Sequence, residues 1–538
     1  MRAITSYRPT RPHILIAAGL IAVLVVAGLG FWFVNSPAAG LHASLAVQNS
    51  EHVHVNEAVP VKFDHPVDLS HVTVTLDPDT PLDIAPSKQE LVIKPQKGWD
   101  TTKRYHLSLS MVPTSDHKLT LKNWSTSFFT QPKVALTAVT VDGKAADPAK
   151  VSMGPKSKLA LTFTLPMKPD TVSVLANGQP VPAGNLQWSP DNQSVTVNPP
   201  GMLPYAPLAL QVAASSQSAY GDPMTDSSNI AVTEQPLLPV NSGSGIDANF
   251  SPVSPIEIVV ENSGDARPQS GLQAADMVYE YISEYSISRM TAIYFNKPPG
   301  LVGPVRSCRM INPYLVFALD GYEECSGASV GTLHYLFGSP LVPGVINDFD
   351  THNHFFRVDF KAAPHNLYTD GDRAASIRQQ WALPPPSYYL DPPHADLDAG
   401  QPADAPSVPL HAVNWSYDGG RKEYLRFDHG APFIDDLAHA QVHAKNVILL
   451  HVGFHDAGWV EDENGGAHSV WYDMLGSGPA EIYSDGKLIH GTWHMGVGGP
   501  QWYYDNHNAP YFTDEQGKLI ELNTGLTWVH VIGNGQTG

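Results

Sequence analysis

The strongest constraint on this chain is an uncharged, apolar run near its start. Residues 14–34 read ILIAAGLIAVLVVAGLGFWFV, and at about 1.5 Å per residue a helix of this length spans the hydrocarbon core of a bilayer. Three arginines precede the run, and no further Lys or Arg occurs before Lys62. Because positive charge stays on the cytoplasmic side, we predict a cytoplasmic tail over 1–13 and a single-pass transmembrane anchor over 14–34.

A cleaved signal peptide is the alternative reading of the same run. Ser36, Pro37 and Ala38 loosely resemble a small-x-small cleavage site. A secretory apolar region is usually only about 7–15 residues long, however. The length of the run therefore favours a retained anchor, with the bulk of the chain outside the cytoplasm.

Charge and cysteine content limit the partners and cofactors. The 52 Asp and Glu residues outnumber the 32 Lys and Arg, which gives a net charge of −20 at pH 7. Such a surface repels the phosphate backbone, so we expect no binding to nucleic acid. The chain has two cysteines, too few for a disulfide scaffold, an iron–sulfur cluster or a thiolate zinc site. No motif requires a cofactor.

The next 200 residues alternate short apolar and polar runs between Pro, Asp and Gly, a pattern typical of β-sandwiches. The element Phe-x-x-Pro-Val at 63–67 returns as Phe-x-x-Pro-Met at 163–167, and Tyr105 returns as Tyr205. A shared offset of 100 residues predicts two copies of one domain, over 41–131 and 132–235. These elements resemble the bacterial Ig-like modules of envelope proteins. We expect them to form a stalk, with His52 and His54 as exposed strand residues.

The distal half begins after a Ser- and Gly-rich stretch at 236–250, which we interpret as a linker. Strands interleaved with short helices then predict a mixed α/β domain over 251–395. A β-rich part follows over 408–538. The fold class we expect is thus multidomain and β-rich: an anchor, two Ig-like sandwiches, an α+β domain and a β-rich domain. Five ordered motifs stand out in the α+β part: E-N-x-x-x-A-R-P-Q-S-G-L (261–272), D-x-V-Y-E (276–280), E-x-x-I-S-R (284–289), G-P-V-R-S-x-R (303–309) and A-P-H-N-L-Y (363–368).

These motifs resemble the YerB-like family, also called the DUF3048 domain family. The β-rich part over 408–538 resembles the C-terminal domain of the same family. The resemblance implies an exported bacterial protein anchored by a membrane segment or a lipid, and it implies no particular reaction.

Arginines are concentrated in this matched region of an otherwise acidic chain. Guanidinium groups bind carboxylate or phosphate with two parallel hydrogen bonds, so several in one cleft would form an anion site. The alternative is that they form buried ion pairs with Asp276, Glu261, Glu280 and Glu284. The candidate ligand-binding residues are Arg267, Arg289, Arg306, Arg309, Arg357, Asn366 and Tyr368, with His365 beside them.

A possible metal site lies in the segment NDFDTHNH. Asp348, Asp350, His352 and His354 alternate with a period of two, so an extended strand would place all four on one face. Two imidazoles and two carboxylates could hold a divalent metal such as zinc. Neighbouring positions of one strand rarely surround a metal, and an exposed loop explains the same residues.

A serine motif raises the possibility of catalysis. Residues 327–331 fit G-x-S-x-G, which on a strand-to-helix turn would expose Ser329 as a nucleophile. His365 would act as base, and Glu280 or Glu284 as acid or base. A Gly-rich turn with a helix-capping serine is the alternative.

Cys308 and Cys325 are expected to form a disulfide. Both lie on the oxidising side of the predicted anchor, and relatives in the resembled family are expected to carry Ala and His at these positions. The alternative is two free buried thiols.

The resulting expectation is an envelope protein whose head binds an anionic wall polymer or a wall-synthesis protein through an Arg/His cleft. The rival is a hydrolase or transferase acting on wall glycan or peptide. A third reading makes the extracytoplasmic part a passive spacer.

Overall fold

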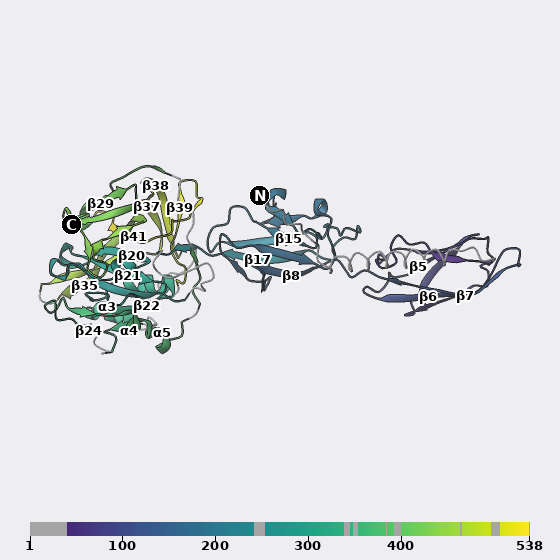
Figure 1. Ribbon diagram of the computed structural model, residues 1–538, viewed down its shortest axis with the longest axis horizontal. Helices are drawn as coiled ribbons and strands as arrows, with labels where there is room; N and C mark the ends of the chain where they lie inside the picture. Colours follow the sequence, from purple (N-terminus) through teal and green to yellow (C-terminus); the bar gives the residue numbers. More distant parts are fainter. Residues whose placement is uncertain are drawn as a thin grey trace, which may run out of the picture.

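A computed structural model describes residues 40–241, 253–337, 345–347, 353–383, 385–391, 400–462, 465–496 and 506–536. The chain is mostly β-structure, arranged as two sandwiches and a larger head in a row, with the second sandwich in the middle (Figure 1). No helix within the described residues is long and apolar enough to cross a membrane. The anchor expected over 14–34 lies outside them.

The first sandwich packs a four-stranded sheet against a three-stranded one. Inward-facing residues alternate along its longest strands, so that Tyr105, Leu107 and Leu109 are buried while their neighbours face outward. The strand orders are β1 (Ala43–Leu45), β2 (Val59–Phe63), β5 (Glu90–Pro95), β4 (Leu82–Pro86) in one sheet and β3 (Thr73–Asp77), β6 (Arg104–Pro113), β7 (Thr120–Phe129) in the other.

The second sandwich repeats part of this plan. Phe63 and Phe163 each end a strand and are buried in their own cores. Tyr105 and Tyr205 are not equivalent, because Tyr105 is a core residue whereas Tyr205 contacts the head. The second sandwich has two five-stranded sheets. The first has the order β10 (Val151–Met153), β17 (Ser228–Glu234), β16 (Pro207–Val212), β12 (Val174–Ala176), β13 (Gln179–Pro180). The second has the order β14 (Leu186–Trp188), β15 (Ser194–Val197), β11 (Leu159–Phe163), β8 (Leu136–Val141), β9 (Lys144–Ala146).

The junctions between the three units are made by specific contacts. His54 Nδ1 lies 2.6 Å from Asp222 Oδ2, and His52 stacks on Tyr220. These two histidines therefore join the sandwiches, and the expectation that they are simply exposed is wrong. At the other junction the Tyr205 hydroxyl donates to the Ser387 carbonyl.

The head contains a sheet of 13 strands that runs through both of its halves. The last strand, β41 (Thr527–Gly533), lies parallel to both β20 (Met277–Ile282) and β35 (Asn446–Asp462) and joins them. The two parts expected over 251–395 and 408–538 thus share one sheet. The order is β23 (Val345–Asn347), β22 (Tyr322–Cys325), β19 (Ile256–Glu261), β21 (Ser288–Tyr294), β20, β41, β35, β37 (Gly476–Ser484), β38 (Lys487–Met495), β39 (Tyr511–Asp514), β40 (Leu519–Ile520), with β27 (Gln401–Pro402) on β38 and β36 (Ala467–Asp473) on β35.

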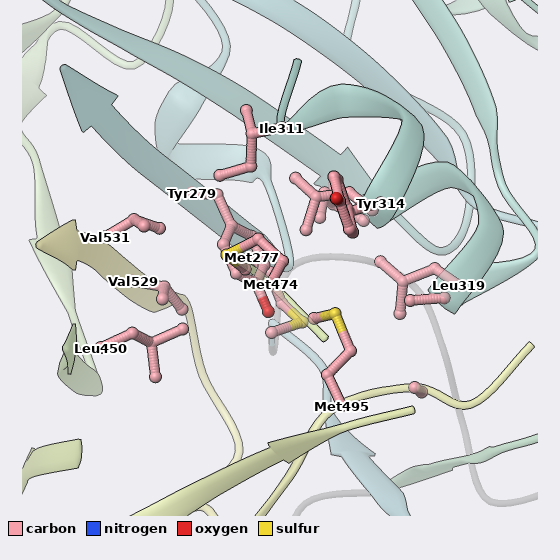
Figure 2. Packing of buried hydrophobic residues seen from close by; sticks show 14 of the residues in the cluster. Met277, Tyr279, Ile311, Tyr314, Leu319, Leu450, Met474, Met495, Val529 and Val531 are labelled. Atoms are coloured by element: carbon pink, nitrogen blue, oxygen red, sulfur yellow. The ribbon is translucent and has the colours of Figure 1, made fainter. Parts of the chain in front are cut away.

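Each face of this sheet has its own core. On one face Met277, Tyr279 and Val529 pack against helix α2 (Asn312–Leu319), as Figure 2 shows. On the other face Val278 and Trp528 pack against a smaller sheet that includes β29 (Val413–Asp418) and β30 (Glu423–Asp428). Burial of both faces explains the near-continuous apolar strands of the head.

The head begins earlier in the chain than the expected linker allows. Leu237–Pro239 form strand β18, which pairs with β26 (Tyr389–Asp391), and Leu238 and Val240 are buried in the head core. The first part of 236–250 therefore belongs to the head, not to a linker, and residues 242–250 lie outside the described residues.

The disulfide between Cys308 and Cys325 is confirmed, with the Cα atoms 5.5 Å apart.

Candidate functional site

A cleft of about 680 Å³ opens at one end of the head sheet. The end of β19, the turn between β20 and β21, the loop before α2 and the start of α3 (Val330–Phe337) form its walls, together with the tip of β35. Both halves of the head therefore contribute to it. Of the sequence-predicted residues, the cleft gathers Glu284, Arg289, Arg306, Arg309, Ser329, Arg357 and His365.

Arg289 is one of two deeply buried cations of the cleft, the other being Arg309. The Arg289 side chain is 92% buried, and its Nη1 donates to the Ser307 carbonyl at 3.2 Å. Its Nε has no hydrogen-bond partner, and no carboxylate of the described residues forms an ion pair with it. Burial and the charge of Arg309 lower the pKa of Arg289 to about 10. The charge of Glu284 acts in the opposite direction and raises the Arg289 pKa, but no direct ion pair to Arg289 forms within the described residues.

Glu261 and His365 form a second group in the same cleft. His365 Nδ1 lies 3.0 Å from Glu261 Oε1, and the Ser263 hydroxyl donates to the same oxygen at 2.8 Å. Arg306 Nε lies 3.4 Å from it, while Glu261 Oε2 is buried without a partner. The Glu261 carboxylate, bound at Nδ1, fixes the orientation of the imidazole ring. The other ring nitrogen, Nε2, faces away from Glu261 and lies 3.9 Å from the exposed Asp265.

Arg309 is held by carboxylates on two sides. Its guanidinium forms a bidentate pair with Glu284 and lies 3.4 Å from Glu461 Oε1. Burial opposes ionisation of Glu284, but the charge and hydrogen bonds of Arg309 outweigh it and lower the Glu284 pKa to about 2. A carboxylate held ionised in this way has no proton to donate, which argues against Glu284 as a general acid.

Ser329 is bonded in the manner of a helix cap. Its hydroxyl donates to Glu461 Oε2 at 2.8 Å and accepts from the indole N–H of Trp459 at 3.1 Å. It also accepts from the Thr332 backbone N–H at 3.3 Å, at the start of α3. These bonds match the capping alternative, and no described histidine is bonded to the hydroxyl.

Three of the predicted ligand-binding residues do not line the cleft. Arg267 forms an ion pair with Asp428 at 2.5 Å, and Tyr368 is fully buried. Asn366 accepts a hydrogen bond from Arg357 Nη1 at 2.8 Å and so helps to orient the side chain of Arg357. Arg357 itself is exposed and has no ion pair among the described residues.

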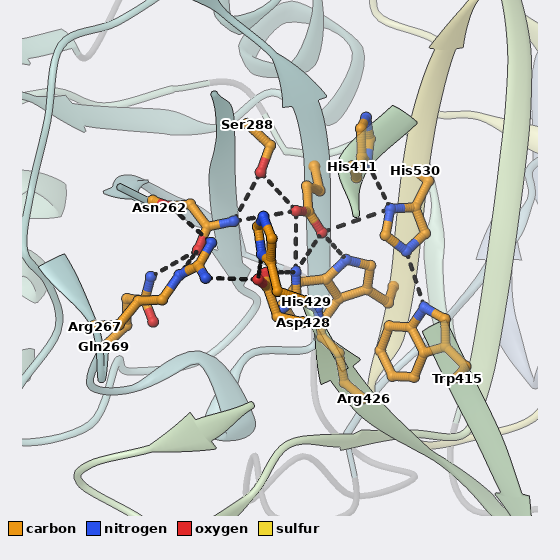
Figure 3. A network of polar contacts seen from close by, with 12 residues as sticks. Asn262, Arg267, Gln269, Ser288, His411, Trp415, Arg426, Asp428, His429 and His530 are labelled. Atoms are coloured by element: carbon orange, nitrogen blue, oxygen red, sulfur yellow. Dashed lines mark hydrogen bonds and ion pairs between the residues drawn. The ribbon is translucent and has the colours of Figure 1, made fainter. Parts of the chain in front are cut away.

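Glu280 lies on the opposite face of the sheet, because it alternates with Tyr279 and Tyr281. It is completely buried and accepts from Arg426 at 3.0 Å and from the Trp528 indole at 2.9 Å (Figure 3). Burial raises its pKa, but the charge of Arg426 outweighs this and lowers it to about 2. Glu280 therefore cannot reach a ligand in the cleft, and we assign it to the core.

The same network contains the one described cluster that could hold a metal, formed by Glu280, His411 and His530. The two Nδ1 atoms are only 2.8 Å apart and share a hydrogen bond. His530 Nε2 accepts from the Trp415 indole, and Arg426 lies beside the carboxylate. Burial lowers the pKa of both histidines. The pair is neutral and the Arg426 guanidinium lies against the same carboxylate, which makes this a poor cation site.

Of the four residues of the metal site expected in NDFDTHNH, the structure describes His354, and its contacts do not support a metal site. His354 is buried, with Nδ1 3.1 Å from Glu324 and Nε2 2.8 Å from Gln380. Both ring nitrogens thus have protein partners. Asp348, Asp350 and His352 lie outside the described residues.

Glu461 and Ser263 are cleft residues that the sequence reasoning missed. Glu461 comes from the far end of the long strand β35, 132 positions from Ser329. No local pattern in the sequence marks it. Ser263 lies inside the first matched motif, and its place between Glu261 and His365 depends on the fold.

Comparisons with known proteins agree with this architecture. Residues 242–381 match the family described as "Protein of unknown function (DUF3048) N-terminal domain", and residues 406–529 match the corresponding C-terminal domain. A Bacillus subtilis (strain 168) protein named "Putative lipoprotein YerB" is 26% identical over 294 residues, which are 52% of this chain and 81% of that protein.

Solved structures give weaker likenesses. The crystal structure of YerB from Bacillus subtilis is 23% identical, covers 55% of this chain and 97% of its own, and has a TM-score of 0.44. An L,D-transpeptidase from Mycobacterium tuberculosis H37Rv is 11% identical, covers 36% of this chain and 98% of its own, and has a TM-score of 0.14. Scores this low support no inference about activity. The two matched domains in order, with the YerB relative, show that this chain belongs to the YerB-like DUF3048 family.

Proposed function

We propose that this protein is associated with the bacterial cell envelope and that its head binds an anionic ligand in the cleft, as a binding or scaffolding protein. The observation that carries the proposal is Arg289, a buried guanidinium that forms no direct ion pair with a carboxylate of the described residues. A buried charge without a partner lowers stability by several kcal/mol. A bound anion would supply the missing charge and the missing acceptor for Nε.

Two further cations extend this site outward. Arg306 is about one-third exposed and only weakly paired, with its Nε 3.4 Å from Glu261. Arg357 is exposed and hydrogen-bonded to an amide. The three arginines thus lie at increasing exposure from the interior to the surface. This arrangement suits a ligand with more than one negative charge, such as an anionic wall polymer or an acidic region of a wall-synthesis protein.

The envelope location rests on two observations. The apolar run at 14–34 has the length and flanking charge of an anchor. The YerB relative is named as a lipoprotein, which is a class of protein held at the membrane. The two sandwiches would then separate the head from the membrane surface.

A hydrolase or transferase acting on wall glycan or peptide is the second candidate. The pairing of His365 with Glu261 favours it, because a carboxylate at Nδ1 orients an imidazole as a base. Neither Ser329, whose hydroxyl donates to Glu461, nor the buried Glu280 supplies the remaining roles. A nucleophile is therefore lacking among the residues expected to provide one.

Binding to purified wall polymer tests the two candidates together. The full-length protein in detergent micelles is titrated with teichoic acid in a calorimeter, and soluble fragments are measured in the same mixture. We expect binding without fragments, lost in Arg289→Met and retained in Arg421→Met, which removes a surface arginine that is 58% exposed and, within the described part of the chain, paired with Asp418 alone. Fragments that disappear in His365→Ala would establish the enzyme instead.

A further inference from the structure

Exposed hydrophobic side chains gather around the cleft. Between Ile256 and the C-terminus, eight large hydrophobic side chains of the described residues are exposed. Tyr285 and Ile287 line the cleft itself, and Val330 and Val460 directly adjoin the lining residues Ser329 and Glu461. With Val253, nine such side chains are exposed in the described part of the head; two of them line the cleft and two more are chain neighbours of lining residues. Single exposed apolar residues are normal, but a group beside a cleft marks an interaction surface.

Tyr285 is held in this position at a conformational cost. It occupies the tight turn between β20 and β21, where Tyr285 and Ser286 both have a φ of 56°. Two successive left-handed residues define the type I′ hairpin turn, which favours Asn and Gly. The chain instead places a tyrosine there, 55% exposed, with its hydroxyl donating to Asp462 at 2.7 Å. An unfavourable turn residue that projects over a cleft points to a role in binding.

The rim of the cleft, by which we mean Tyr285, Ile287, Val330 and Val460, is also held in place through Ser329 and Glu461. The carboxylate of Glu461 accepts from the backbone N–H and the hydroxyl of Ser329, which fixes the start of α3 to the tip of β35. Trp459 packs against Gly331 so closely that any added Cβ would overlap its ring. Val330, 78% exposed, and Val460 are thereby presented on a fixed surface. Apolar side chains beside a buried arginine have the composition of a binding hot spot.

We infer that the cleft binds an acidic peptide segment of a partner protein, in which carboxylates alternate with aliphatic or aromatic side chains. The inference rests on the proposed anion site and names its ligand class. Arg289, Arg306 and Arg357 take the carboxylates, the apolar rim takes the intervening side chains, and the buried Glu261 Oε2 accepts a backbone N–H. A cleft of about 680 Å³ accommodates a few residues of such a segment.

An anionic glycopolymer fits this rim less well. Sugar rings stack on flat aromatic faces, whereas three of the four exposed apolar residues in the cleft lining or next to it in the chain are aliphatic: Ile287, Val330 and Val460. Aliphatic surface pairs with apolar side chains, and arginine clusters are a common means of recognising acidic motifs in proteins. The rim therefore distinguishes a peptide from a polymer that offers charge alone.

The test compares three fluorescein-labelled heptapeptides by anisotropy with the full-length protein in detergent micelles. The first alternates Leu and Glu, the second Leu and Gln, and the third Ser and Glu. We expect the Leu–Glu peptide to bind at least about tenfold more tightly than either of the others, since each lacks one half of the recognised chemistry. Arg289→Met abolishes binding of both Glu-containing peptides.

Matched variants separate the rim from the anion site. Ile287→Ser weakens the Leu–Glu peptide by about tenfold and leaves the Ser–Glu peptide unchanged. Ile434→Ser is the control, because Ile434 is 39% exposed like Ile287 but does not line the cleft. Tyr285→Asn raises the thermal midpoint by relaxing the turn and still weakens the Leu–Glu peptide.

Three results would overturn the inference. Equal binding of the Leu–Glu and Ser–Glu peptides would show that the apolar rim does not contribute to binding, while the anion site would still be supported. Tighter, Arg289-dependent binding of teichoic acid would make the ligand a glycopolymer. If neither the peptides nor teichoic acid binds, the anion site itself fails, and the proposed function fails with it.

Discussion

Glu261 and Arg289 face each other directly across the antiparallel strands β19 and β21, yet their side chains do not form an ion pair. Glu261 is committed to His365, Ser263 and Arg306. Arg289 bonds only the Ser307 carbonyl among the described residues. Opposite charges at facing positions normally stabilise a sheet. Here an acceptor on Glu261 and a donor on Arg289 are both left unused inside one cleft.

Two carboxylates buried in the same sheet predict a dependence of stability on pH. Glu257 and Glu323 are register partners on β19 and β22, and both oxygens of Glu257 lack hydrogen-bond partners. Burial raises the pKa of Glu257 well above 4.5, and burial with the charge of Glu257 raises that of Glu323. The folded state therefore binds more protons than the unfolded state, and stability is lost as pH rises above about 4.5.

Glu257→Gln should remove this penalty. The unfolding free energy of the variant minus that of the wild type is expected to increase between pH 5 and pH 8, by up to about 1.4 kcal/mol per pH unit. Thermal unfolding of both proteins at several pH values measures this difference in unfolding free energy. A difference that stays constant over this range would show that Glu257 ionises normally in the folded protein.

The buried pair of Arg426 and Glu280 joins the two matched domains and should be essential to the head. Removing one partner of a buried pair leaves an uncompensated charge, so Arg426→Met is expected to lower the unfolding free energy by roughly 3–5 kcal/mol. Arg421→Met, at an exposed arginine, should change it by less than about 0.5 kcal/mol. Urea denaturation compares the two variants; equal, small effects would mean that the network contributes little.

The disulfide should stabilise the loop that carries Arg306 and Arg309. Cys308 and Cys325 are 17 positions apart, and closing a loop of that size contributes on the order of 3 kcal/mol in the chain-entropy model. The double variant Cys308→Ala/Cys325→Ala is expected to lose about this much in urea denaturation. A wild-type protein that is equally stable with and without dithiothreitol would contradict the expectation.

Ser329 should behave as a cap residue. Ser329→Ala removes its hydroxyl bonds to Glu461 and to the Thr332 backbone, and is expected to lower the unfolding free energy by about 1–2 kcal/mol. Ser329→Thr keeps the hydroxyl and should retain most of the stability. If Ser329→Ala leaves stability intact but stops release of wall fragments, the serine is a nucleophile after all.

Local chemistry explains what could be predicted from the sequence. The repeated Phe63 and Phe163 elements mark two sandwiches, and the clustering of arginines marks the region of the cleft. The two cysteines identify the disulfide. Each of these depends on residue type and spacing within a short stretch, or on a pattern that recurs along the chain.

Sheet topology explains what could not be predicted. Insertion of β41 between β20 and β35 brings Trp528 and His530 onto Glu280, which makes an apparent catalytic acid a core residue. The same shared sheet brings Glu461 to Ser329 across more than a hundred positions. Pairings between distant strands leave no trace in local periodicity, because strands of a sheet covered on both faces lack a regular alternation of apolar and polar residues.

The unfolding free energy of Arg289→Met, measured in urea without ligand and beside its teichoic acid binding, tests the central claim most directly. If Arg289 is kept for a ligand, the variant is as stable as the wild type or more stable, because a buried uncompensated charge has been removed. Binding is then lost. A variant that loses roughly 3–5 kcal/mol would instead mean that Arg289 has a structural partner, which would contradict the account.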